Sequence, residues 1–215
     1  MPSTTVLMTI AINVISFAVG FLAYYLTSYL SSTAKRKNLE LMISYLINLV
    51  LFIWVAKVVL QLPLFLSDPI AVLAYPSDAQ AFYLALILLA IQISYQVKKN
   101  GLQIQNLLVN YIPVLVVASF TYQFMDIVWH DNPLAWGNFV LMILLLLLFL
   151  LLRERMQDHI LLISLTISWM SGKLILSYLL PFTTIFGYMI HPLFLITVGM
   201  ISLIIFIFKR KRVSS

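Results

Sequence analysis

The chain has 215 residues, of which 63% are hydrophobic and only 9% are charged, and its mean hydropathy is +1.05. A water-soluble domain must cover its core with polar surface, so this composition excludes a soluble globular protein. The chain contains no cysteine, which excludes disulfide bonds, thiolate metal ligands and cysteine nucleophiles. The sequence therefore predicts a single all-α domain that crosses a membrane several times.

Seven hydrophobic stretches are long enough to span a bilayer as helices. In chain order they cover about 6–30, 39–62, 81–97, 104–124, 134–152, 160–180 and 187–208, and a short basic tail follows at 209–215. Pro113 lies inside the fourth stretch, where a proline can kink a membrane helix without ending it. We therefore expect seven transmembrane helices.

The positive charges predict the orientation of these helices. Eleven of the thirteen Lys and Arg residues lie in four clusters, at 35–37, at 98–99, at 153 and 155, and at 209–212. In a seven-span chain these clusters fall in alternate loops and at the C-terminus, all on one side. By the positive-inside rule the N-terminus lies outside and the C-terminus lies in the cytoplasm. The same rule accounts for the net charge of +6 without a nucleic-acid partner.

The longest interruption between hydrophobic stretches is the segment 61–83. It contains three of the eight prolines and two of the seven acidic residues, Asp68 and Asp78, and no Lys or Arg. Irregular backbone at a membrane boundary is tolerated only against protein or a water-filled recess. We therefore expect an irregular outer loop beside a binding site. Its two carboxylates could form an acid–base pair, although solvated loop carboxylates are more common.

The two remaining cations, Lys57 and Lys173, lie inside predicted spans, each about 10 Å from the outer boundary at the helical rise per residue. Each could extend along its helix to the headgroups. Alternatively, both could face the bundle interior and form a paired cationic site for a lipid phosphate. Gln61 and Ser177 lie four residues after Lys57 and Lys173 respectively, and these polar neighbours favour the interior site.

The histidines do not form a recognisable catalytic or metal-binding motif. His159 is expected at the cytoplasmic boundary and His130 in an outer loop, where both would be solvated. A metal site built from His130, His191 and nearby aspartates is conceivable, but the spacings match no ligand motif. We therefore predict neither a metal nor a cofactor.

The order of these features resembles the prolipoprotein diacylglyceryl transferases. Residues 62–73, LPLFLSDPIAVL, are similar to that family's segment between its second and third spans, and 106–113, NLLVNYIP, to the start of its fourth. Asn132-Pro133 falls where the family has His-Pro, and 172–180, GKLILSYLL, where it has an Arg-rich helix end. The resemblance implies a seven-span protein of the bacterial cytoplasmic membrane. Members of this family transfer the diacylglyceryl group of phosphatidylglycerol to a lipoprotein cysteine.

The chain departs from the family at the residues that carry the chemistry. Tyr83 stands where the family has its essential histidine, and Phe120 and Gln123 stand at the signature Arg and Asn. Lys173 and Ser177 stand at a later Arg and Glu. The resemblance thus implies Tyr83 and Gln123 as weak catalytic candidates. A tyrosine replaces a histidine base poorly, and Phe120 cannot bind a phosphate as an arginine does.

Three functions are compatible with these residues. The first is a non-catalytic relative that binds a phospholipid, with phosphatidylglycerol suspected, or a lipoprotein segment in an outer-leaflet cavity, alone or beside another membrane protein. The second is an active lipid transferase with a divergent site. The third is a small membrane transporter, against which the lack of an internal sequence repeat counts. We favour the first.

Overall fold

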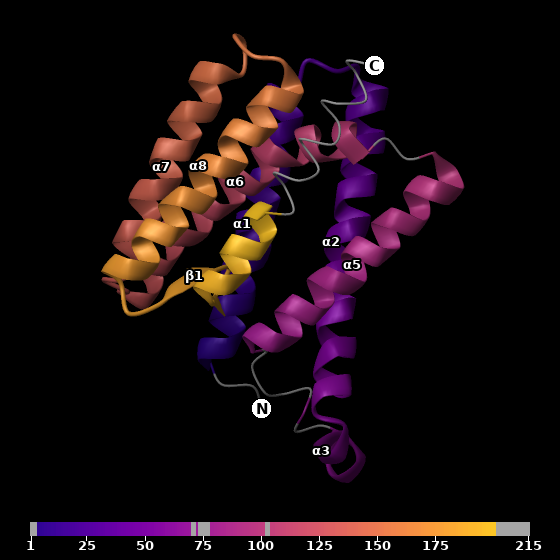
Figure 1. Ribbon diagram of the computed structural model, residues 1–215, viewed down its shortest axis with the longest axis vertical. Coiled ribbons are helices and arrows are strands. Elements are labelled where there is room, and N and C mark those ends of the chain that lie inside the picture. Colours follow the sequence, from indigo (N-terminus) through magenta and orange to yellow (C-terminus); the bar gives the residue numbers. More distant parts are fainter. Residues whose placement is uncertain (1–3, 70–71, 73–77, 102–103, 201–215) are drawn as a thin grey trace.

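The computed structural model of the protein describes residues 4–69, 72, 78–101 and 104–200. The helices and strands of this part, labelled in Figure 1, are α1 (Thr4–Thr27), α2 (Ser32–Leu60), α3 (Leu62–Ser67), α5 (Ala79–Asn100), α6 (Ile104–His130), α7 (Ala135–Leu152), α8 (Asp158–Leu179), β1 (Thr183–Ile185) and β2 (Tyr188–Ile190). A further helical segment covers 192–200. The fold is therefore helical apart from one short hairpin among the described residues.

Six of the described helices, α1, α2, α5, α6, α7 and α8, are long and apolar enough to cross a membrane. The chain is accordingly a multi-pass membrane protein. The seventh span predicted at 187–208 begins later than expected, because 188–190 form β2 and the helix starts at 192. Residues 201–208 lie outside the described part, so a seventh span stays a prediction.

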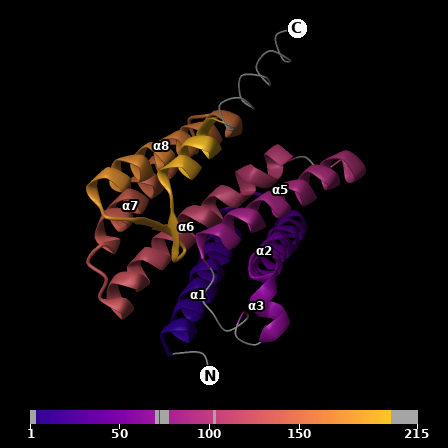
Figure 2. The same ribbon diagram turned by 60° about the horizontal axis from the view of Figure 1, so that its bottom comes forward.

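The long helices pack as neighbours in a defined order. α1 packs against α6, α6 against α7, α7 against α8, and α2 against α5. Figures 1 and 2 show α7 and α8 on one side, α2 and α5 on the other, and α1 and α6 between them. The helices α1 and α6 approach each other closely at Gly20, where an added Cβ would lie 2.6 Å from the Val114 carbonyl oxygen. Only glycine fits there without moving a helix.

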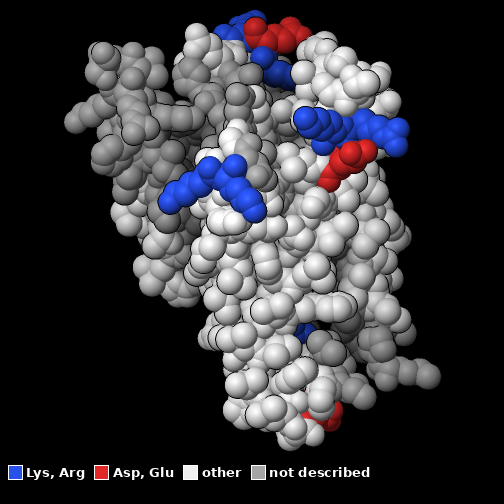
Figure 3. Space-filling view, turned by 90° about the vertical axis from the view of Figure 1, so that its right-hand side faces the viewer, with Lys and Arg blue, Asp and Glu red and all other residues white. Residues whose placement is uncertain are grey.

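One end of the bundle carries the basic loops, and we call it the basic end. Figure 3, which looks at the right-hand side of Figure 1, shows Lys and Arg gathered toward this end. There the Arg153 guanidinium donates to the Thr27 carbonyl oxygen (2.6 Å), and the Lys35 ammonium donates to the Tyr25 carbonyl oxygen (2.9 Å). Both cations thus stabilise the C-terminal end of α1, where the helix dipole is negative. Which end faces the cytoplasm stays a prediction.

Two sequence-based boundaries are wrong. The segment 61–83 is less irregular than predicted, because residues 62–67 form α3 and the Asp78 carboxylate accepts from the Ala81 backbone amide (2.8 Å), capping α5. The helix α6 continues past the expected end at 124 to His130, and Asp131, with φ of 47°, reverses the chain there. Residues 125–130 remain helical because the Asp126–His130 contact, between side chains four residues apart, stabilises the last turns of α6, and most of the other side chains there are apolar.

The segment between α8 and the helix at 192–200 is an antiparallel β-hairpin, which the sequence did not indicate. Ile185 pairs with Tyr188 across the two-residue turn Phe186–Gly187, and both turn residues have positive φ, 50° and 88°. This matches the type I′ turn that suits a tight hairpin, but it places a bulky residue in a conformation that costs about 1–2 kcal/mol.

Aromatic contacts hold this turn against α1 and α6. The Phe186 ring stacks on Phe17 of α1 (centroid distance 4.8 Å) and meets Tyr122 of α6 edge-on (5.6 Å). Such pairs stabilise a structure beyond the apolar area that they bury, which offsets the cost of the turn. The hairpin tip therefore lies between α1 and α6, at the end opposite the basic loops. We call this the hairpin end.

Candidate functional site

Lys173 is the central residue of the site at the hairpin end. Its side chain, on α8, is only 2% exposed. The ammonium donates to Asn138 Oδ1 on α7 (2.6 Å) and to the Thr184 carbonyl oxygen in β1 (2.7 Å). Lys173 therefore points into the protein and joins α7, α8 and the hairpin. The alternative in which it extends to the headgroups is wrong.

The surroundings of Lys173 leave its charge unbalanced. Both of its partners are neutral oxygens, and it takes no part in the ion pairs Arg36–Glu40 and Asp126–His130. Buried cations in membrane proteins are normally paired. An ammonium also carries three hydrogens, of which these contacts use two. The arrangement can therefore accept an anionic group on the remaining hydrogen.

Gln123 of α6 lies at the same level of the bundle as Asn138. Phe139, the neighbour of Asn138, stacks on Phe120 (5.1 Å) and lies 6.1 Å from Phe124, on either side of Gln123 in the sequence. Gln123 is 3% exposed, and its Oε1 has no hydrogen-bond partner among the described residues. A buried amide oxygen without a donor is unfavourable. Gln123 could therefore accept a hydrogen bond from a ligand.

Tyr83, the other catalytic candidate, is occupied by structural contacts. Its hydroxyl accepts a hydrogen bond from the His191 backbone amide (2.8 Å), and its ring stacks on Phe194 (4.4 Å). These contacts tie α5 to the segment that follows the hairpin. They give Tyr83 a structural role, and its catalytic role stays a prediction.

That Lys57 and Lys173 together form one cationic site for a lipid phosphate stays a prediction. Lys57 is also buried, at 5% exposure, so it too faces the interior, but its charge is attracted by Asp78. Gln61 is only partly buried at the end of α2. The Ser177 hydroxyl donates to a carbonyl of its own helix, that of Leu174 (2.7 Å). The structure thus places Lys173 and Gln123 at one level, whereas Lys57, Tyr83 and Ser177 each interact with other groups.

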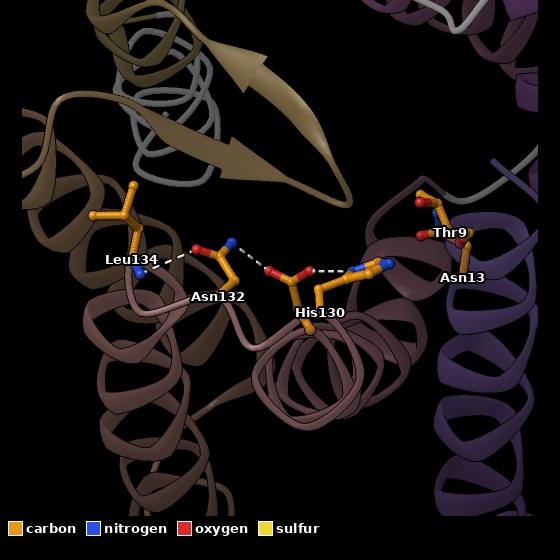
Figure 4. A network of polar contacts seen from close by, with 6 residues as sticks. Thr9, Asn13, His130, Asn132 and Leu134 are labelled. Carbon is orange, nitrogen blue, oxygen red and sulfur yellow. Dashed lines mark hydrogen bonds and ion pairs between the residues drawn. The ribbon is translucent and has the colours of Figure 1, made fainter. Parts of the chain in front are cut away.

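A second polar cluster lies at the end of α6 (Figure 4). His130 Nδ1 lies 2.8 Å from Asp126 Oδ1, and Asn132 Nδ2 donates to Asp126 Oδ2 (2.9 Å). Asp126 is only 8% exposed. The prediction that His130 lies in an outer loop is wrong, because His130 is the last residue of α6, where its side chain is partly exposed. A buried carboxylate that orients a histidine leaves Nε2 positioned to act as a base.

This pair could have been found from the sequence. Asp126 and His130 are four residues apart, which places them on one helical face once α6 is extended to His130. Figure 4 shows the cluster beside Thr9 and Asn13 of α1.

The conceivable metal site is not assembled in the described part of the chain. There, no group of three or more His, Asp or Glu side chains could hold a metal ion. His191 Nδ1 instead accepts from the Leu193 backbone amide (3.3 Å). The side chain of His159 lies outside what the structure describes.

No protein-family model, curated protein or solved structure matches this chain. We therefore infer its function from the chemistry of the site, with the family resemblance as an expectation.

Proposed function

We propose that this chain is a non-catalytic, multi-pass protein of the bacterial cytoplasmic membrane that binds an anionic phospholipid at its hairpin end. The observation that carries this proposal is Lys173, a buried cation with two neutral oxygen partners and no acidic one in the described part. A phosphate would supply both the missing charge and an acceptor for the third ammonium hydrogen. With the orientation predicted from the charged loops, this site lies in the outer leaflet.

Phosphatidylglycerol is the headgroup that we favour. It combines a phosphate, which suits Lys173, with glycerol hydroxyls, which could donate to the unpaired Oε1 of Gln123. The resemblance supports this choice, because Lys173 stands where the diacylglyceryl transferases have an arginine. The same resemblance supports a non-catalytic role, because Tyr83 and Phe120 replace the family's histidine and signature arginine. In this role, a lipoprotein segment or another membrane protein would contact the lipid that this chain holds.

The lipid that copurifies with the protein tests this proposal. We expect Lys173→Met to reduce bound phosphatidylglycerol about tenfold or more, since it removes a charge-assisted hydrogen bond and the charge itself. Lys173→Arg should retain the lipid. Lys57→Met is the matched control and should also retain it, because the charge of Lys57 is already attracted by Asp78.

Lipid per protein, measured by mass spectrometry after purification in mild detergent, decides between these outcomes. Equal phosphatidylglycerol in the wild type and in Lys173→Met would refute the proposal. An equal loss in Lys57→Met would show a general effect of charge instead of a site at Lys173.

The Asp126–His130 pair favours a second candidate, an active lipid transferase with a relocated base. Under this candidate, the protein should restore lipoprotein maturation in cells depleted of their own prolipoprotein diacylglyceryl transferase. His130→Gln should then lower the rate about 10²-fold or more, the usual contribution of a general base. Our leading proposal predicts no rescue by the wild type. Mature lipoprotein on an immunoblot of the complemented cells distinguishes the two.

A further inference from the structure

A stripe of residues on α2 faces away from the rest of the bundle. It consists of Ser44, Asn48, Leu51 and Val55, which follow one another at spacings of four, three and four. Leu51 and Val55 are 49% and 50% exposed. The helix α2 lies at the edge of the bundle with α5 as its main neighbour (Figures 1 and 2). The spacing is that of helices that pack side by side in a left-handed crossing.

Asn48 makes this stripe unlike an ordinary lipid-facing surface. It lies in the middle of the 29-residue helix α2, it is partly exposed, and its amide makes no hydrogen bond within the described part of the chain. Two other asparagines in membrane spans do have partners, since Asn138 accepts from Lys173 and Asn110 accepts from the Tyr24 hydroxyl. An amide left unpaired in hydrocarbon costs several kcal/mol. This surface therefore requires a polar partner.

Ser44 gives a second sign of the same kind. Two other exposed serines bond to their own helices, since Ser94 donates to the Ala90 carbonyl oxygen (2.7 Å) and Ser171 donates to that of Ile167 (2.8 Å). The Ser44 hydroxyl makes no such bond among the described residues. Ser44 and Asn48 are thus adjacent polar groups, one turn apart, on one exposed face. A small residue such as serine also lets a second helix approach closely.

We propose that this stripe binds the same stripe of a second copy of the chain, with the two Asn48 amides hydrogen-bonded to one another. An amide carries both a donor and an acceptor, so it complements its own copy across a two-fold axis. A symmetric crossing at the middle of α2 places Asn48 opposite Asn48, with Leu51 and Val55 packing beyond it. A single asparagine at such a position also sets the register of the pair. This inference is independent of the proposed lipid site.

Thiol cross-linking in native membranes locates the interface, because the chain has no cysteine of its own. We expect Ser44→Cys and Leu51→Cys to form covalent dimers on mild oxidation. The matched control is Leu144→Cys on α7, which is 58% exposed and outside the stripe and should stay monomeric. Equal cross-linking at Leu144 would overturn the assignment of this face. A disulfide within one chain of the double variant Leu51→Cys/Ile204→Cys would also overturn it, because the chain's own segment 201–208 would then cover the stripe.

The strength of association tests the role of the amide. The dimer fraction is measured by single-molecule photobleaching in liposomes over a range of protein dilutions, which gives the affinity of dimerisation. We expect this affinity to be about tenfold lower for Asn48→Leu than for the wild type. Asn48→Gln keeps the amide and should keep the dimer, and Ser94→Leu on α5 should leave it unchanged. A wild type that is monomeric at every dilution would refute the proposal, as would an unchanged affinity in Asn48→Leu.

Discussion

Replacing Asn138 by leucine should lower the free energy of unfolding by about 2–3 kcal/mol, because it leaves the buried Lys173 ammonium without one of its two hydrogen-bond partners. The remaining contact, to the Thr184 carbonyl oxygen, cannot compensate for the lost hydrogen bond. We expect this variant to be among the least stable single substitutions in the bundle. Denaturant unfolding in detergent micelles, followed by the fluorescence of the four tryptophans, measures the loss.

The double variant Asn138→Leu/Lys173→Met separates the charge from the packing. Replacing a buried polar pair by apolar residues of similar volume is often neutral or stabilising. We therefore expect the double variant to recover most of the stability lost in Asn138→Leu while binding no phosphatidylglycerol. A double variant as unstable as the single one would show that the leucine fits poorly and that the stranded ammonium is not the cause. Recovered stability without lipid would indicate that Lys173 is retained for binding.

The second large effect is expected at Gly20. A Cβ there would lie 2.6 Å from the Val114 carbonyl oxygen and 3.2 Å from the Ala118 Cβ. A backbone oxygen cannot turn aside as a side chain can, so Gly20→Ala should push α1 and α6 apart. We expect a loss of about 1–3 kcal/mol, the usual cost of overpacking. The melting temperature in detergent should fall accordingly.

Gly137→Ala is the matched control for this prediction. An added Cβ there meets only the side-chain ends of Leu176 (3.0 Å) and Leu180 (3.3 Å), which can rotate away. The exchange should be near neutral or stabilising by up to about 1 kcal/mol, because alanine favours the helix. Equal shifts in melting temperature for the two variants would contradict the close approach of α1 and α6 as the cause.

The long helices could be predicted because length and hydrophobicity are sufficient to locate a membrane span. Their ends were less predictable. The hydrophobic stretch ends near Phe124, but α6 continues to His130 because polar residues at a helix end can pair with one another, as Asp126 and His130 do. Because the predicted helix ended near residue 124, Asp126 and His130 were not recognised as neighbours on one helical face.

The hairpin could not be predicted, because Thr183–Ile190 is as apolar as a span and its turn lacks the usual Asn-Gly. The conformation of Phe186 depends on Phe17 and Tyr122, which are far away in the sequence. The interior position of Lys173 was one of two predictions. Its partners Asn138 and Thr184 come from separate elements, so their contact with it follows only from the packed fold.

The position of the hairpin after α8 has a consequence for biosynthesis. The helices α1 to α8 precede it, so they leave the ribosome and enter the membrane first. Until Thr183–Ile190 follows, Lys173 lacks its Thr184 partner and the space between α1 and α6 lacks Phe186. Domains generally assemble from the N-terminus as they are made, but this interior closes only after residues 183–190 have been synthesised. A chain truncated before residue 183 should therefore insert its helices and remain a substrate for membrane proteases.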